Sequence, residues 1–196
     1  NGTTTEEYIL VVRHADGWDR LEQLRGRSLN VLHNPRMSLA EIWLDLELGK
    51  LHEPRFSGFF GNIAVKKNVS QAILPVFFGK ADACLVTQEG FKIMAELNPQ
   101  IKSQMRIIAT SPPVVPSGLA IRKDYISPFR TPLLEAMERL DSSPAGRQIL
   151  TLIQAQRVKH YPLSILDKSL SLIAEHKLMY GDSRIGTAGW IPGVSK

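Results

Sequence analysis

The sequence predicts an α/β protein built on a parallel β-sheet with helices on both faces. Residues 28–110 alternate between short apolar runs and segments whose apolar residues recur at helical spacing. Parallel strands need long crossovers, and helices usually supply them. Two similar segments, VVRHAD and AIRKD, flank this region, and both run from apolar residues into Arg and Asp. We therefore expect one parallel-sheet lobe bracketed by two crossover strands that lead to a second lobe.

Each element follows from its local pattern. Short apolar runs predict strands at 8–13, 28–32, 62–66, 81–87, 105–110 and 118–124, and the continuous run at 8–13 is expected to be buried. Amphipathic spacing and terminators predict helices, at 18–27, 38–49, 70–79, 89–97, 131–140, 144–154 and 163–176. Ser38 and Ser143 are expected as N-caps of their helices, and Asn68 or Ser70 as the cap of the third. Pro75 lies inside that third helix, which is therefore kinked or begins later.

These elements divide the chain into four segments. We expect a first-lobe crossover strand, an α/β ligand-binding lobe, a return crossover with C-terminal helices, and an extended tail, at residues 1–14, 15–117, 118–176 and 177–196.

Composition narrows the classes of function. The chain has 196 residues, a formal charge of +5 and a sequence pI of about 9.4. Lys and Arg are scattered, with only pairs at 66–67 and 122–123, so nucleic-acid binding is not expected. No apolar run is long enough to span a membrane. Cys84, the single cysteine, lies in an apolar run and is expected to be a buried, inert thiol.

The candidate site lies where the parallel strands end, because ligands bind outside the carboxyl ends of open sheets. The loops there are 33–38, 66–70, 87–90 and 110–117, and the first three lead into helix N-termini. Unpaired N–H groups and the helix dipole favour anions at such ends. Arg36, Lys66 and Lys67 add positive charge, so the edge is predicted to bind a small anion.

Every candidate also has a purely structural interpretation. Ser38 can simply cap its helix, and Arg36 can be a solvated loop residue. Thr87, Gln88 and Glu89 can be turn and cap residues, although Glu89 could instead hold the amino group of a ligand.

Catalysis has little support in the sequence. The five histidines show no metal-ligand spacing and have no partner cysteines. Neither a G-x-S-x-G elbow nor a G-x-x-x-x-G-K-[ST] phosphate loop is present. We therefore predict no catalytic residues, no metal and no cofactor.

Four motifs, taken in order, resemble a known family. They are YILVVRHADGWDRLEQLRGRSL, FFGKADACLV, ATSPPVVPSGLAIRKD and LDSSPAGRQIL. The chain from about Tyr8 to His176 resembles the phosphate, phosphite and phosphonate solute-binding proteins of ABC transporters, which have the type II periplasmic-binding fold. Arg36, Met37, Ser38 and Leu39 stand where the family usually has a Ser/Thr-rich turn that binds the oxyanion, and only Ser38 keeps a hydroxyl.

The resemblance implies two hinged lobes that close over a phosphonate- or phosphate-like anion in an interlobe cleft. It implies a periplasmic or membrane-anchored extracytoplasmic protein that passes its solute to a membrane permease. The chain begins at the first crossover, so we expect the opening segment of the first lobe to be missing. The loops and the resemblance together give the predicted ligand-binding residues, Asn34, Arg36, Met37, Ser38, Asn68, Ser70, Thr87, Gln88, Glu89 and Ser111.

Two other functions stay open at this point. One is a ligand-sensing domain of the same fold in a signalling or regulatory protein. The other is a small α/β hydrolase that uses Ser38 or Cys84.

Overall fold

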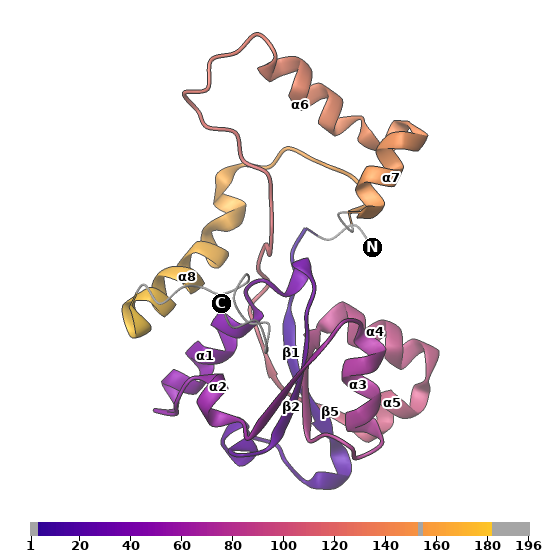
Figure 1. The fold of residues 1–196 in the computed structure, drawn as a ribbon, viewed down its shortest axis with the longest axis vertical. Coiled ribbons are helices and arrows are strands. Elements are labelled where there is room, and N and C mark those ends of the chain that lie inside the picture. Colours follow the sequence, from indigo (N-terminus) through magenta and orange to yellow (C-terminus); the bar gives the residue numbers. More distant parts are fainter. Residues whose placement is uncertain (1–3, 153–154, 182–196) are drawn as a thin grey trace, which may run out of the picture. The chain divides into compact units, whose positions relative to one another are not determined.

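The computed structural model describes residues 4–152 and 155–181 (Figure 1). The chain forms two compact units. The sheet unit holds the described residues of 5–117 and 166–181, and the helical unit holds Thr4 and those of 118–165.

A five-stranded sheet forms the centre of the sheet unit. Its strands are β1 (Tyr8–Arg13), β2 (Ser28–Leu32), β3 (Asn62–Lys66), β4 (Ala83–Thr87) and β5 (Met105–Thr110), in the order β3-β2-β4-β1-β5. β2 pairs in parallel with β3 and β4, whereas β1 is antiparallel to both β4 and β5. The strands of 28–110 run in one direction, which confirms the predicted parallel arrangement, and β1, predicted as a crossover strand, makes the sheet mixed because it lies between β4 and β5 in the opposite direction.

The position of each strand explains its composition. Tyr8 to Val12 in β1 are 0% exposed, because this strand has a neighbour on each side and packed side chains on each face. β3 is an edge strand, and its Asn62 and Val65 are exposed. The continuous apolar run at 8–13 is thus a buried inner strand, as predicted.

Helices cover both faces of the sheet (Figure 1). One face carries α1 (Ala40–Lys50) and α2 (Phe56–Phe59), and the other carries α3 (Val69–Phe77), α4 (Gln88–Leu97) and α5 (Pro99–Gln104). Pro75 lies within α3. The helix predicted at 18–27 is only a 3-10 turn, η2 (Leu21–Leu24), and Gly49 lies inside α1 instead of ending it.

The C-terminal helix also belongs to the sheet unit. After the 3-10 turn η5 (Leu163–Leu166), α8 runs over Asp167–Tyr180 and packs against α1. Lys177 to Tyr180 are therefore helical, and the predicted extended tail is wrong for these residues. Residues 182–196 of that tail lie outside the described residues.

The helical unit has few buried side chains. It contains α6 (Arg130–Glu138), η4 (Leu140–Ser142) and α7 (Pro144–Leu152), and in these elements only Gly146 and Leu150 are buried. Ser143 Oγ accepts a hydrogen bond from Gly146 N at 3.0 Å, which confirms the predicted N-cap. Residues 118–124 are not a strand, so the second crossover strand was predicted wrongly. Leu119 there is 76% exposed, and an apolar run with no partner strand cannot form a ladder.

Candidate functional site

One edge of the sheet gathers the predicted loops. Leu32 pairs with Lys66 and Tyr8 with Thr87, while Ile9 pairs with Thr110. The ends of β2, β3, β4 and β5 and the start of β1 therefore lie along one side, as expected for the four loops. We call this side the carboxyl edge: it comprises Glu6–Tyr8 and the loops 33–38, 66–70, 87–90 and 110–117.

The first loop does not start its helix as the sequence predicts. Asn34 Oδ1 accepts from Arg36 N at 2.9 Å and caps a 3-10 turn, η3 (Pro35–Met37). α1 follows with Leu39 at its N-cap and no side-chain hydrogen bond there. Ser38 is therefore not a cap, and its hydroxyl donates to Pro116 O at 2.5 Å. The reason is local, because Pro35 fixes the turn three residues earlier and Asn34 supplies the cap.

An ion pair and a backbone hydrogen bond hold Arg36 in position at this edge. Its guanidinium forms an ion pair with Glu6, whose side chain is 4% exposed, while the Arg36 side chain is 38% exposed. Tyr8 Oη donates to Arg36 O at 3.0 Å. Burial raises the pKa of Tyr8 to about 12, so the phenol stays protonated as a donor at neutral pH.

Glu6 and Tyr8 were not predicted as site residues. Tyr8 begins β1 and Glu6 lies just before it, and only the antiparallel pairing of β1 brings them to the carboxyl edge. The pair of glutamates before an apolar strand, Glu6 and Glu7, is the one signal for them in the sequence.

The starts of α3 and α4 lie further along the same edge. Asn68 Oδ1 accepts from Gln71 N at 2.9 Å and from Ser70 Oγ at 2.8 Å, so Asn68 is the cap and Ser70 is not. Thr87 Oγ1 accepts from Gly90 N at 3.1 Å, and Gln88 is exposed. Since the Asn34 and Asn68 oxygens are used as caps, their amide nitrogens are the groups that they can offer to a solute.

Positive charge gathers beside the start of α3. A surface groove between the end of β3 and α3 is lined by Lys66, Lys67, Ser70, Phe78 and Lys80, among others. Two lysines from the edge thus share this groove with one of the predicted ligand-binding residues.

Three predicted residues lie inside the protein. Met37 is 6% exposed and packs in the core, Thr87 is 6% exposed and Ser111 is 3% exposed. Ser111 Oγ accepts from Tyr8 N at 2.8 Å and donates to Pro112 O at 2.9 Å. These three side chains therefore support the edge from within.

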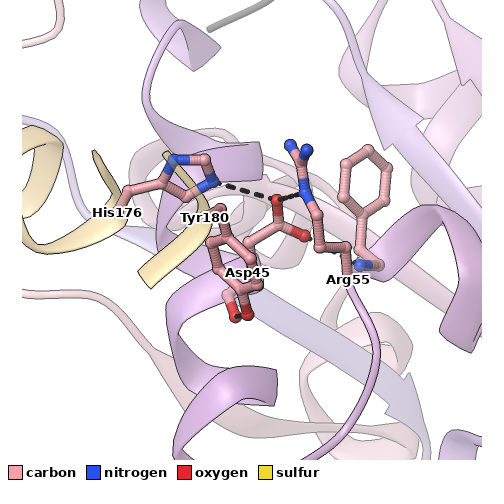
Figure 2. A network of polar contacts seen from close by, with 5 residues as sticks. Asp45, Arg55, His176 and Tyr180 are labelled. Atoms are coloured by element: carbon pink, nitrogen blue, oxygen red, sulfur yellow. Dashed lines mark hydrogen bonds and ion pairs between the residues drawn. The ribbon is translucent and has the colours of Figure 1, made fainter. Parts of the chain in front are cut away.

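A second polar cluster lies away from this edge, where α8 meets α1 (Figure 2). The Asp45 carboxylate accepts from Arg55 Nε at 2.6 Å and Phe56 N at 2.8 Å, and it contacts His176 Nε2 at 3.1 Å. Tyr180 Oη donates to Asp45 O at 2.9 Å. Asp45 is 0% exposed and His176 is 1% exposed, so no substrate reaches this acid–histidine pair.

The cluster also lacks a nucleophile. His176 Nδ1 has no hydrogen-bond partner among the described residues, so no hydroxyl or thiol there is activated by the imidazole. The arrangement joins α8 to α1 and is architectural. The described residues also contain no group of three or more potential metal-ligating side chains.

Most of the chain matches the model of a known protein family. A family model described as "ABC transporter, phosphonate, periplasmic substrate-binding protein" matches residues 1–161. The chain belongs to this family. The predicted relationship is thereby confirmed, and the family consists of transport solute-binding proteins that act in the periplasm. No curated protein matches the chain.

Solved structures of several proteins have a similar fold at low sequence identity. XAC2383 from Xanthomonas citri bound to ATP has a TM-score of 0.61 at 15% identity over 89% of this chain and 67% of its own. A binding component of an ABC phosphonate transporter from Pseudomonas aeruginosa, PA3383, has a TM-score of 0.59 at 13% identity over 95% of this chain and 62% of its own.

A third structure, PhnD1 from Prochlorococcus marinus in complex with methylphosphonate, has a TM-score of 0.55 at 14% identity over 89% of this chain and 66% of its own. The chain thus spans about two thirds of the length of these structures. The predicted type II periplasmic-binding fold is confirmed. Within the described part of the chain, no helix combines the length and apolar character that a membrane crossing requires.

Proposed function

We propose that this chain is the solute-binding component of an ABC transporter and that it binds a small phosphonate- or phosphate-like anion at the carboxyl edge. The solute is passed to a membrane permease, and the protein works outside the cytoplasm. The family assignment supports the transport role.

The observation that carries the proposal is the shared register of β2, β3 and β4. Leu32 pairs with Lys66, and Val31 pairs with Leu85, so the loops after these strands open on one side. Anions bind at such positions because helix N-termini present N–H groups there. α3 and α4 both begin at this edge.

The predicted residues then divide by role. Arg36 supplies a charged planar donor, which suits an oxyanion better than a neutral hydroxyl does. The side chains that reach the surface of the edge are proposed to contact the solute, and they are Asn34, Arg36, Ser38, Asn68, Ser70, Gln88 and Glu89. Met37, Thr87 and Ser111 are buried and are proposed to shape the edge from within.

A thermal-shift screen tests the proposal. Phosphate, phosphite, methylphosphonate, sulfate and acetate are added to the 196-residue chain and to Arg36→Ala. A ligand at a hundred times its dissociation constant should add about 2.7 kcal/mol to the free energy of unfolding. We expect a shift with at least one of the phosphorus anions, and a smaller shift for Arg36→Ala.

Arg20→Ala is the matched control. It removes the same charge, and the Arg20 side chain is 73% exposed and follows the opposite end of β1. An anion shift that is the same in the wild type, Arg36→Ala and Arg20→Ala would contradict a site at Arg36. An absence of any shift would contradict anion binding itself.

A further inference from the structure

The ion pair between Glu6 and Arg36 is built on two fixed stretches of backbone. Glu6 N donates to Val114 O at 2.7 Å, and Val114 N donates to Glu6 O at 2.9 Å. Arg36 is held by Asn34 through its N–H and by Tyr8 through its carbonyl. The two charged side chains thus extend from positions that the fold determines.

The two partners differ in their exposure. The Glu6 side chain is 4% exposed, whereas that of Arg36 is 38% exposed. A guanidinium has five N–H donors, and this ion pair engages one of its terminal nitrogens. Arg36 therefore retains donors for a solute while Glu6 stays buried.

The buried carboxylate opposes any anion that approaches Arg36. The pair is neutral as a whole, so Arg36 attracts an anion less than an isolated guanidinium would. Water screens a buried charge poorly, and the repulsion grows in proportion to the charge of the anion. Loss of the fixed Arg36 orientation would act in the opposite direction, but the Arg36 backbone stays held by Asn34 and Tyr8 when the charge of Glu6 is removed.

We propose that Glu6 is a built-in counter-ion that sets the affinity and charge selectivity of the carboxyl edge. Glu6 weakens the binding of every anion at Arg36, and it weakens dianions more than monoanions. This inference rests on the proposed function, because it takes Arg36 as the anion-binding group.

The test is Glu6→Gln, which removes the charge and keeps the shape and a hydrogen-bond acceptor. Glu7→Gln is the matched control, since it makes the same change in net charge at the next residue, and the ion pair is formed by Glu6. The probes are sulfate and nitrate, which stay a dianion and a monoanion near neutral pH. Binding is measured by isothermal titration calorimetry on the 196-residue chain, and melting curves check folding.

We expect Glu6→Gln to bind sulfate about tenfold more tightly than the wild type and to gain less for nitrate. Glu7→Gln should change either affinity by less than about twofold, because its charge is not at the pair. Glu6→Met, which also removes the charge, should reproduce the gain and serves if Glu6→Gln does not fold.

Each contrary result has a distinct meaning. Unchanged or weaker sulfate binding by Glu6→Gln, with binding by the wild type intact, overturns the role of Glu6 and leaves the proposed function standing. Equal gains in Glu6→Gln and Glu7→Gln also overturn it, because net charge alone would then explain the effect. No anion binding by the wild type or by any variant overturns both.

Discussion

Asp45 and Glu6 are two buried carboxylates of the sheet unit, and each is paired with an arginine. The arginines are similarly exposed, 40% for the Arg55 side chain and 38% for that of Arg36. The carboxylates differ in their other neighbours. Asp45 also meets Phe56 N and His176 Nε2, which come from α2 and α8, whereas the described ion-pair partner of Glu6 is Arg36.

The difference separates architecture from a site that can respond to a solute. A carboxylate surrounded by fixed, buried donors cannot change partners without leaving those donors unsatisfied. The Arg36 side chain is 38% exposed and this ion pair engages one of its terminal nitrogens, so an anion can bind the remaining guanidinium donors while the ion pair with Glu6 stays intact. The same ion-pair chemistry thus stabilises the fold at α1 and modulates charge at the carboxyl edge.

The largest expected effect is that of Asp45→Asn. The Asn side chain has an NH2 group in place of one carboxylate oxygen. This group cannot accept a hydrogen bond, so either His176 Nε2 or Phe56 N is left without an acceptor. We expect the free energy of unfolding to fall by about 3 kcal/mol, as measured by urea denaturation.

Glu47→Gln is the control for that experiment, because it lies in the same helix and pairs with Lys50 at 2.7 Å on the surface. Its loss should be below about 1 kcal/mol. Equal losses in the two variants would show that burial and donor number at Asp45 do not matter.

The second prediction concerns Tyr8, which supports the Arg36 carbonyl. Its pKa is raised from 10.0 to about 12, mainly because burial disfavours the phenolate. Because this pKa is higher in the folded state than in the unfolded state, the folded protein keeps its full stability with respect to this group below pH 10. That contribution to the free energy of unfolding is lost as the pH rises through about 12. The loss should reach about 2 to 3 kcal/mol in urea unfolding followed between these pH values.

Tyr8→Phe should lack this component of the alkaline loss, although it is less stable at neutral pH by about 1 kcal/mol. Tyr125→Phe, at a side chain that is 49% exposed, should keep the wild-type pH profile. An identical profile in Tyr8→Phe and the wild type would mean that the Tyr8 phenol is not protected by burial.

The third prediction tests what holds the segment that pairs with Glu6. Ser169 Oγ accepts from Val115 N at 2.8 Å and donates to Val115 O at 3.1 Å, and Ser169 is 4% exposed. Ser169→Ala leaves both backbone groups of Val115 buried without this partner. The expected loss in thermal or urea unfolding is about 2 kcal/mol.

Ser171→Ala in the same helix is the control, since Ser171 is exposed. It should change the stability by less than about 0.5 kcal/mol. A loss in Ser171→Ala as large as that in Ser169→Ala would show that the effect does not come from the contact with Val115, since Ala favours a helix more than Ser does.

The sequence predicted the elements whose signal is local. The runs 8–13, 28–32, 62–66 and 105–110 form strands because short, mostly apolar runs rich in β-branched residues suit a strand, and Ser143 caps α7 because its acceptor acts within three residues. An apolar run carries no direction, however, so the antiparallel orientation of β1 could not be predicted. The segment at 118–124 has the composition of a strand and forms none, since pairing depends on a partner elsewhere.

At the carboxyl edge, too, only the features with a local signal could be predicted from the sequence. The pairing of β2, β3 and β4 follows from alternation with helices, and so the position of the loops was predictable. Ser38 instead donates to Pro116, which is 78 residues away, and Arg36 pairs with Glu6 from another strand. No spacing rule relates such residues, and only the folded sheet brings them together.

The smallest expected effect is the loss of stability in Glu6→Gln, and it is the sharpest test of the comparison. The change is the same acid-to-amide replacement as in Asp45→Asn, again beside an arginine. Gln keeps an acceptor for Arg36, which is 38% exposed and stays solvated, so no buried charge is stranded. The free energy of unfolding should fall by less than about 1 kcal/mol in urea denaturation without added anions. If Glu6→Gln loses as much as Asp45→Asn in the same buffer, Glu6 is as architectural as Asp45, and the distinction between the two carboxylates fails.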